Sequence, residues 1–226
     1  MTILIVMAHP DDEILGCGGT ISRLISEGDE AFSLIMGEGI TSRYAKREDA
    51  DREQIKELHK KNRQAAEIIG ISKTFWQDLP DNMFDTVPLL DIIKTIEVKI
   101  KEVNPEKIFT HHAGDLNIDH AIISKAVLTA TRPQNNTPVK ELFTCEIPSS
   151  TEWTFEYFEP LWKHNVFFDI SQTLDKKILA LQAYESEMRP FPHPRSNENI
   201  TNIARRWGSI TGTFAAEAFQ LIRAIR

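Results

Sequence analysis

Short apolar runs alternate with longer segments of helical periodicity over the first two thirds of this 226-residue sequence. The first run, TILIVM (2–7), is almost wholly apolar, as expected of a strand that is covered on both faces of its sheet. The same reasoning predicts further strands at 31–36, 73–78, 107–111 and 139–147. It predicts helices between them at 18–26, over a segment that ends near residue 69, at 89–103 and at 121–131. This order predicts an α/β fold, with a mostly parallel, Rossmann-like sheet and helices on both faces.

The pattern becomes less regular after Pro148. A strand at 164–170 and helices at 175–188, 197–207 and 212–222 are predicted there. Among them, the segment RPFPHPRS (189–196) contains three prolines, which exclude regular structure. The sequence shows no internal repeat, low-complexity tract or linker. We therefore expect a single domain that spans residues 1–226.

The charge and the cysteines limit the classes of function. The net charge is −7 and the pI about 5.5, so the basic field typical of nucleic-acid binding is missing. Cys17 and Cys145 form no disulfide framework, which favours a reducing compartment. The opening apolar run is too short for a signal peptide or a membrane span, and no later run approaches spanning length. We therefore expect a cytoplasmic protein without membrane insertion, acting on a small molecule and open to homo-oligomerisation.

Three polar segments follow predicted strands: HPDDE (9–13), GEGITSR (37–43) and HHAGDLNIDH (111–120). In an open α/β sheet, ligands bind outside the carboxyl ends of the strands. The three segments are far apart in the sequence, but this rule places them at one edge of the sheet. The functional site is expected there.

The carboxylates of the first segment need a partner, because buried carboxylates must be paired, protonated or bound to a cation. No lysine or arginine lies within HPDDE, so a metal ion would meet the need. His9 and Asp12 are three residues apart on a tight turn and can reach one ion, and His120 at the start of a helix can supply a third ligand. Two histidines and one carboxylate form the ligand set of a hydrolytic zinc site, although Fe²⁺ or another divalent ion uses it too.

Asp11 would then lie beside a water molecule bound to the metal and could remove its proton. Ligating histidines need carboxylates that hold their rings in place, and Glu13, Asp115 and Asp119 are the candidates. The residues therefore predict metal-assisted hydrolysis of a carbonyl bond.

AHPDDEILGCGGTISRL resembles the N-terminal signature of the LmbE-like, or PIG-L, family of metal-dependent N-deacetylases. FTHHAGDLNIDHAIISKAV is similar to the second metal motif of that family. The resemblance implies a three-layer sandwich, zinc bound by His9, Asp12 and His120, and Asp11 as general base. It also implies removal of an acetyl group from an N-acetylated amino sugar of the N-acetylglucosamine type, linked to a nucleotide or lipid or belonging to a surface glycan pathway.

One position departs from the family pattern. Many members have a histidine three residues before the last ligand, where this chain has Asn117. An asparagine can donate a hydrogen bond to an oxyanion, but it cannot protonate the leaving amine. His193, His111 or His112 would have to supply that proton.

Three arginines are candidates for substrate binding: Arg43, Arg189 and Arg195. Each could hold a phosphate or carboxylate group of the substrate through bidentate contacts. This would let an acidic protein bind an anionic sugar derivative.

Other interpretations remain open at this point. HPDDE taken alone could be a solvated turn, because acidic residues are favoured at a helix N-terminus. GCGG (16–19) lacks the spacing of a dinucleotide-binding motif. The chain could be a non-catalytic sugar- or nucleotide-binding module on the same fold, or a hydrolase of another amide or ester.

Overall fold

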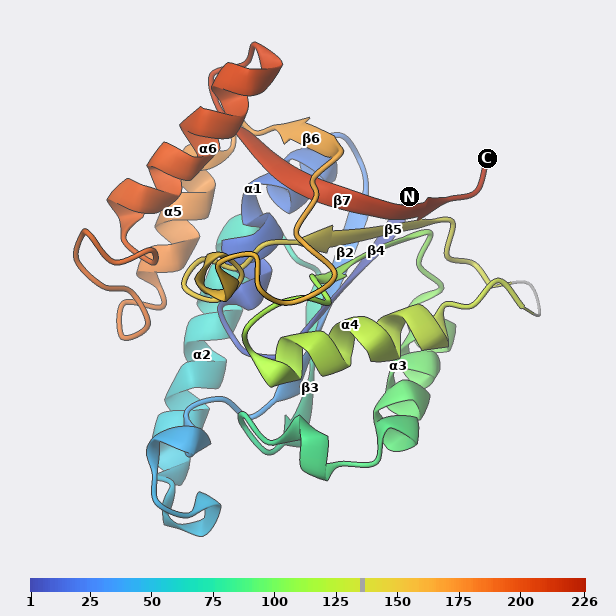
Figure 1. Ribbon diagram of the computed structural model, residues 1–226, viewed down its shortest axis with the longest axis vertical. Coiled ribbons are helices and arrows are strands. Elements are labelled where there is room, and N and C mark those ends of the chain that lie inside the picture. The colour runs from blue at the N-terminus through green and yellow to red at the C-terminus, as the bar shows by residue number, and fades with distance from the viewer. Residues whose placement is uncertain (135–136) are drawn as a thin grey trace.

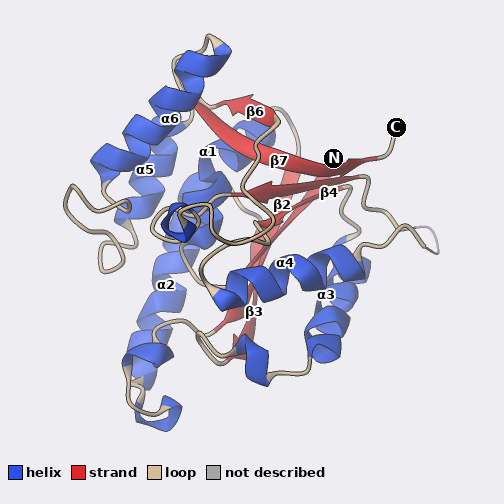
Figure 2. Ribbon diagram, in the orientation of Figure 1, coloured by secondary structure: helices blue, strands red, loops and turns tan. Residues whose placement is uncertain are grey.

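One seven-stranded sheet runs through the molecule in the computed structural model, which describes residues 1–134 and 137–226 (Figures 1 and 2). Its strands are β1 (Thr2–Met7), β2 (Glu30–Gly37), β3 (Lys73–Leu79), β4 (Lys107–His111), β5 (Glu141–Cys145), β6 (Val166–Asp169) and β7 (Ala216–Ala224). They lie in the order β3-β2-β1-β4-β5-β7-β6. The first five strands pair in parallel, and β7 pairs antiparallel with both β5 and β6.

Helices cover both faces of this sheet. They are α1 (Asp12–Ser26), α2 (Arg52–Ile69), α3 (Leu89–Val103), α4 (Ile118–Ala130), α5 (Leu174–Gln182) and α6 (Asn197–Thr211). Figure 1 shows α1, α2 and α5 on one side of the sheet and α3 and α4 on the other. The predicted three-layer α/β architecture with a mostly parallel sheet is therefore confirmed.

Strand β1 occupies the centre of the sheet and contributes to both halves of the core. Ile3 and Ile5 pack with residues of α1 and α2, whereas Leu4 and Val6 pack with residues of α3 and α4. All four side chains are fully buried. Side chains alternate between the faces of a strand, so a strand buried on both faces must be apolar throughout.

The prediction of a helix at 212–222 is wrong, because most of β7 is formed by residues of this segment. The predicted helix before it is real and extends to Thr211, where Gly212 ends it with a φ of 75°. The following segment, TFAAEAF, is apolar and alanine-rich, and a run of this kind does not by itself distinguish a strand from a helix. Pairing with β5 on one side and β6 on the other decides the outcome.

Two helix N-termini lie at the carboxyl edge of the central strands. Helix α1 begins at Asp12, earlier than the predicted start at Gly18, so the HPDDE segment spans the turn between β1 and α1. Helix α4 begins at Ile118, shortly after β4. Since β1 and β4 are parallel neighbours, the two helix starts lie side by side.

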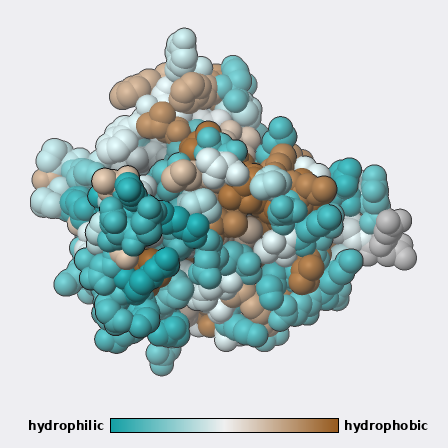
Figure 3. Space-filling view, turned by 90° about the horizontal axis from the view of Figure 1, so that it is seen from below, coloured by the Kyte–Doolittle hydropathy of each residue, from teal (hydrophilic) through white to brown (hydrophobic). Residues whose placement is uncertain are grey.

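Within residues 1–134 and 137–226, no helix combines the length and apolar character needed to cross a membrane. The charged segment that leads from β2 into α2 gives a hydrophilic surface on the left of Figure 3.

Candidate active site

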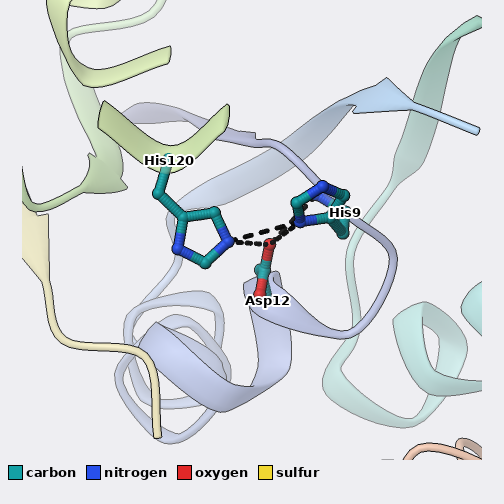
Figure 4. A group of neighbouring side chains, drawn as sticks. All are labelled: His9, Asp12 and His120. Atoms are coloured by element: carbon teal, nitrogen blue, oxygen red, sulfur yellow. Dashed lines mark hydrogen bonds and ion pairs between the residues drawn. The ribbon is translucent and has the colours of Figure 1, made fainter. Parts of the chain in front are cut away.

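The two sequence motifs meet at the carboxyl edge of the sheet. His9 comes from the turn after β1, Asp12 from the first turn of α1 and His120 from the first turn of α4 (Figure 4). His120 Nε2 lies 3.3 Å from both His9 Nδ1 and Asp12 Oδ2. His9 Nδ1 lies 3.4 Å from Asp12 Oδ2. One oxygen and two nitrogens therefore converge on a single point.

These three residues fit a divalent cation. Asp12 is fully buried, and its Oδ1 has no hydrogen-bond partner among the described residues. Burial alone would lower the pKa of each histidine, but the neighbouring carboxylates outweigh it and raise the pKa of His9 to about 10 and that of His120 to about 9. The negative charge of the site thus demands a positive one, which is either a proton or a metal ion. Two imidazoles and one carboxylate suit zinc or Fe²⁺.

Both histidines are oriented by further carboxylates. His9 Nε2 is 3.0 Å from Asp119 Oδ2, and His120 Nδ1 is 3.1 Å from Asp115 Oδ1. Each carboxylate leaves the opposite ring nitrogen facing the convergence point. Such contacts fix the ring and its tautomer in metal sites.

The chain holds these carboxylates firmly. The backbone N–H groups of Asn82 and Phe84 donate to Asp119 at 2.7 and 3.0 Å. The hydroxyls of Ser150 and Thr151 donate to Asp115. The sequence motifs predicted Asp119 and Asp115 but not these donors, because the donors come from loops after β3 and β5.

Asp11 precedes Asp12 in the chain and lines the same cleft as His9. Its backbone has a φ of 108°, a region that residues other than glycine rarely adopt and that is often found at functional sites. Arg195 Nη1 donates to its Oδ2 at 2.7 Å. Burial raises the pKa of Asp11, the Arg195 charge opposes this, and the neighbouring carboxylates add to it. The group is suited to accepting a proton.

Glu13 supports Asp11 rather than the ligand rings. Its Oε2 accepts the backbone N–H of Asp11 at 3.0 Å. Its Oε1 accepts from the Tyr184 hydroxyl at 2.7 Å and from Asn62 Nδ2 at 3.0 Å. Burial raises the pKa of Glu13 to about 7, against the opposing hydrogen bond from Tyr184.

A cleft of about 190 Å³, lined by His9 and Asp11 among other residues, opens beside the convergence point. Asn117 lines it and also begins helix α4: its Oδ1 accepts the N–H of Asp119 at 2.9 Å, and its Nδ2 donates to Asn82 Oδ1 at 2.9 Å. Arg43 and Glu187 form a wall of the cleft, with Arg43 Nη2 2.5 Å from Glu187 Oε2. Glu187 was not among the residues predicted from the sequence.

Asp81 is another cleft residue that was not predicted from the sequence. Its Oδ1 lies 3.3 Å from His9 Nε2, and its Oδ2 accepts from the Ser42 hydroxyl at 2.6 Å. It lies two residues after the end of β3, so the strand-end rule that singled out the other segments applies to it too.

Arg189, predicted to bind substrate, and His193, predicted to be catalytic, do not line the cleft. Arg189 is exposed, and its Nη1 donates to the backbone oxygens of Ser186 and Met188. His193 accepts the N–H of Arg195 through Nδ1 and packs edge-on against Trp153.

The neighbouring histidines on and after β4 do not line the cleft either. His111 Nε2 accepts the N–H of Ala8 at 2.8 Å, and its ring stacks on that of His120 with centroids 3.9 Å apart. His112 Nε2 donates to the oxygen of Pro160 at 2.7 Å. His111 therefore supports the His120 ring. His112 fixes the loop that contains Pro160.

Comparison with known proteins agrees with this arrangement. A family model described as PIG-L, GlcNAc-PI de-N-acetylase, matches residues 4–131, more than half of the chain. The chain belongs to the PIG-L family. The match includes both motifs and all three residues of the convergence point, and it confirms the resemblance drawn from the sequence.

One PIG-L relative and two solved structures show how far the similarity extends. A protein of Bacillus cereus named probable N-acetyl-alpha-D-glucosaminyl L-malate deacetylase 2 is 30% identical over 82% of this chain and 83% of its own length. The N,N'-diacetylchitobiose deacetylase of Pyrococcus horikoshii has a TM-score of 0.76, with 18% identity over 98% of this chain and 84% of its own. GalB, the 4-carboxy-2-hydroxymuconate hydratase of Pseudomonas putida, reaches 0.78, with 19% identity over 100% and 97%. Because one fold carries different reactions, function must be argued from the site.

Proposed function

We propose that this protein is a metal-dependent hydrolase that removes the acetyl group from an N-acetylated amino sugar of the N-acetylglucosamine type. The observation that carries the proposal is the convergence of His9, Asp12 and His120 within 3.4 Å of one another, with Asp11 beside them at a cleft. Its PIG-L relative in Bacillus cereus is named as a deacetylase of an N-acetylated glucosaminyl compound, which supports the substrate class.

His9, Asp12 and His120 would hold the cation, and three protein ligands leave positions open for water and substrate. A divalent cation in such a site lowers the pKa of a water molecule and polarises a carbonyl group. We propose zinc, with Fe²⁺ as the alternative that the same donors accept.

Asp11 would take a proton from the attacking water and pass it to the leaving nitrogen. The water oxygen bonds to the acetyl carbon, the C–N bond breaks, and acetate and a free amine are formed. The raised pKa of Asp11 suits both transfers, because the carboxyl group must accept the proton and hold it until the amine departs. This route needs no histidine at position 117 and no movement of His193 into the cleft.

Asn117 would stabilise the negative charge that develops on the carbonyl oxygen. Its side chain lines the cleft and is fixed at both ends, by the N–H of Asp119 and by Asn82. A positioned amide donor of this kind contributes to catalysis without reorganisation.

Acetate release from N-acetylglucosamine derivatives tests the proposal. We expect chelation to abolish the reaction and zinc or Fe²⁺ to restore it. Asp11→Asn should lower kcat by about 10²–10⁴-fold because the proton acceptor is lost. Metal content measured on the same sample provides the control, since Asp11 supplies none of the three donor atoms. Full metal-dependent activity in Asp11→Asn would refute the role of Asp11.

The alternative of a non-catalytic sugar- or nucleotide-binding module makes opposite predictions. It predicts that the purified protein lacks a stoichiometric metal ion and that ligand binding survives His120→Ala. A further alternative is hydrolysis of another amide or ester by the same site, and a panel of N-acetylated and non-acetylated substrates would separate it from deacetylation.

A further inference from the structure

A second hollow, of about 510 Å³, lies beside helix α6, and in the described part of the chain it shares no lining residue with the catalytic cleft. Residues within 146–164, which follow β5, form most of its wall, and Arg206 and Trp207 of α6 complete it. Its volume lies within the roughly 300–1,000 Å³ of typical ligand pockets. The reaction proposed above makes no use of this hollow, so its lining must indicate what it can hold.

Aromatic rings form much of the lining. Phe155, Trp162 and Trp207 all contribute side chains, and Phe155 is 84% exposed. The guanidinium carbon of Arg206 lies 4.8 Å from the centre of the Trp207 ring and covers one face of that ring. Phe155 is therefore the most accessible of the three rings. An open aromatic face of this kind can pack against the C–H groups on one face of a sugar ring.

The backbone at Phe155 is strained as well. Its φ is 49° and that of Glu156 is 58°, so two successive residues other than glycine occupy the left-handed region. Such strain persists only where the surroundings impose it, and it gathers at functional sites. Phe155 is thus both strained and exposed, and burial in the core offsets neither cost. Holding this ring outward destabilises the loop, and a role in ligand binding accounts for it.

The polar groups of the lining suit hydroxyl groups. Glu146 accepts the Trp207 Nε1–H at 2.9 Å, and Glu152 accepts the N–H of Ser149 at 2.6 Å. Each carboxylate has further lone pairs that can accept from a hydroxyl group, and Arg206 supplies donors in the same hollow. A hydroxyl group both donates and accepts, so it can pair with either kind of side chain.

Two ring nitrogens of the wall indicate the same class of ligand. Trp162 Nε1 and His164 Nδ1 are buried and have no hydrogen-bond partner among the described residues. Buried polar groups without a partner are rare and costly. The hydroxyl and ring oxygens of a sugar are acceptors of the kind that Trp162 Nε1 requires.

We propose that this hollow binds an uncharged saccharide, separately from the catalytic cleft. A sugar of the glucose type fits best, because its equatorial hydroxyls leave an apolar face for Phe155 and present a polar rim to the carboxylates and Arg206. A cationic ligand fits less well, since it would meet the charge of Arg206 and since two of the carboxylates already accept hydrogen bonds. The proposal does not depend on deacetylation, because His9, Asp12 and His120 do not line the hollow.

Ligand-observed NMR with cellotriose tests the proposal on the full chain. Cellotriose has no acetamide group, so the proposed reaction cannot consume it. We expect it to bind with a Kd of about 1 mM or lower. The trimer of glucosamine, which carries an ammonium group in place of one hydroxyl on each ring, should bind with similar or lower affinity. Absence of cellotriose binding at about 10 mM, or tighter binding of the cationic trimer, overturns the proposal.

Two equally exposed aromatic residues provide a matched pair of variants. Phe155→Ala removes the stacking surface and should weaken cellotriose binding by about tenfold. Tyr157→Ala is the control, because Tyr157 is also 84% exposed but does not line the hollow, and it should leave the Kd unchanged. Equal effects of the two variants would refute the role of Phe155. Urea unfolding of both checks that the fold is retained.

Arg43→Ala distinguishes the hollow from the catalytic cleft. Arg43 lines the cleft and not the hollow, so we expect the affinity for cellotriose to stay the same. If Arg43→Ala weakens binding and Phe155→Ala does not, the sugar binds in the cleft and the proposal fails. Acetate release from N-acetylglucosamine is measured on the same protein. Cellotriose binding without acetate release would refute deacetylation of that sugar and leave the saccharide site standing.

Discussion

Arg195 is the residue whose position in the structure differs most from the role expected for it. The sequence suggested that it contacts the substrate, whereas its guanidinium group contacts Asp11 and, through Nε, the Ser149 hydroxyl at 2.8 Å. Held at both ends, it acts as a positioning residue. Its charge also opposes the effect of burial on the pKa of Asp11.

Replacing Arg195 separates these two roles. We expect Arg195→Gln to lower kcat by about tenfold or more with a smaller change in KM, and Arg195→Lys to recover part of the loss because the charge returns. A substrate-binding arginine would instead raise KM and leave kcat unchanged. Steady-state kinetics on an N-acetylated sugar distinguish the two outcomes. Arg189→Gln is the matched control and should behave as the unmodified protein, since Arg189 is exposed and does not line the cleft.

Substitution of Asp119 tests whether metal binding depends on a carboxylate that holds the His9 ring in place. It contacts His9 Nε2 at 3.0 Å and is fully buried. We expect Asp119→Asn to weaken zinc binding by about 10–100-fold, measured by competition with a chelating dye, because the His9 ring loses the nearer of the two carboxylates that contact its Nε2. Asp85→Asn, an exposed change of the same kind a few residues from the Asp119 donors, should not alter the affinity. Unchanged affinity in Asp119→Asn would show that His9 needs no such support.

Individual residues differ in how readily the sequence reveals them. The charged motifs predict His9, Asp12 and His120 as metal ligands, because the carboxylates of HPDDE have no basic residue within the segment and require a cation. Asn62 leaves a weaker signal, a polar residue on the otherwise apolar face of α2 with Ile55, Leu58 and Ala65. Tyr184 and Glu187 could not be recognised from the sequence. Their contacts depend on the conformation of the segment after α5, which local sequence pattern does not specify.

Strand β7 illustrates the limit of local pattern at the level of elements. Its alanine-rich sequence favours a helix, yet it completes the sheet between β5 and β6. Glu217 on this strand is 5% exposed and accepts the N–H groups of Gly19 and Thr20 at 3.1 and 2.7 Å. Lys177 of α5 donates to it at 2.6 Å. The buried Glu217–Lys177 pair therefore connects β7 to α5, and the hydrogen bonds from Gly19 and Thr20 connect it to α1. The strand conformation of β7 places Glu217 where it can make these contacts.

This pair predicts a clear effect on stability. Lys177→Met should lower the free energy of unfolding by about 3–5 kcal/mol, because Glu217 would remain buried without its charged partner. Lys176→Met, the neighbouring exposed lysine, should change it by less than about 0.5 kcal/mol. Urea unfolding followed by circular dichroism measures both. Equal stability of the two variants would mean that Glu217 is satisfied by the α1 backbone alone.

For the whole molecule, the order of strands and helices was enough to predict the architecture and the edge where the site lies. Residues more than a hundred positions apart come together because β1 and β4 are parallel neighbours that both end at this edge. The surroundings of the site were less predictable. They come from loops after β3 and β5 and from the segment after α5, whose paths follow from tertiary packing rather than from periodicity.

The central claim is that one metal ion held by His9, Asp12 and His120 supports hydrolysis of an N-acetylated sugar. Zinc titration of the metal-free protein, with acetate release recorded at each addition, tests it most directly. We predict that activity rises linearly and breaks at about one equivalent of zinc per chain, and that His120→Ala shows neither the break nor the activity. Full acetate release by the metal-free protein, or an undiminished break in His120→Ala, would contradict this account.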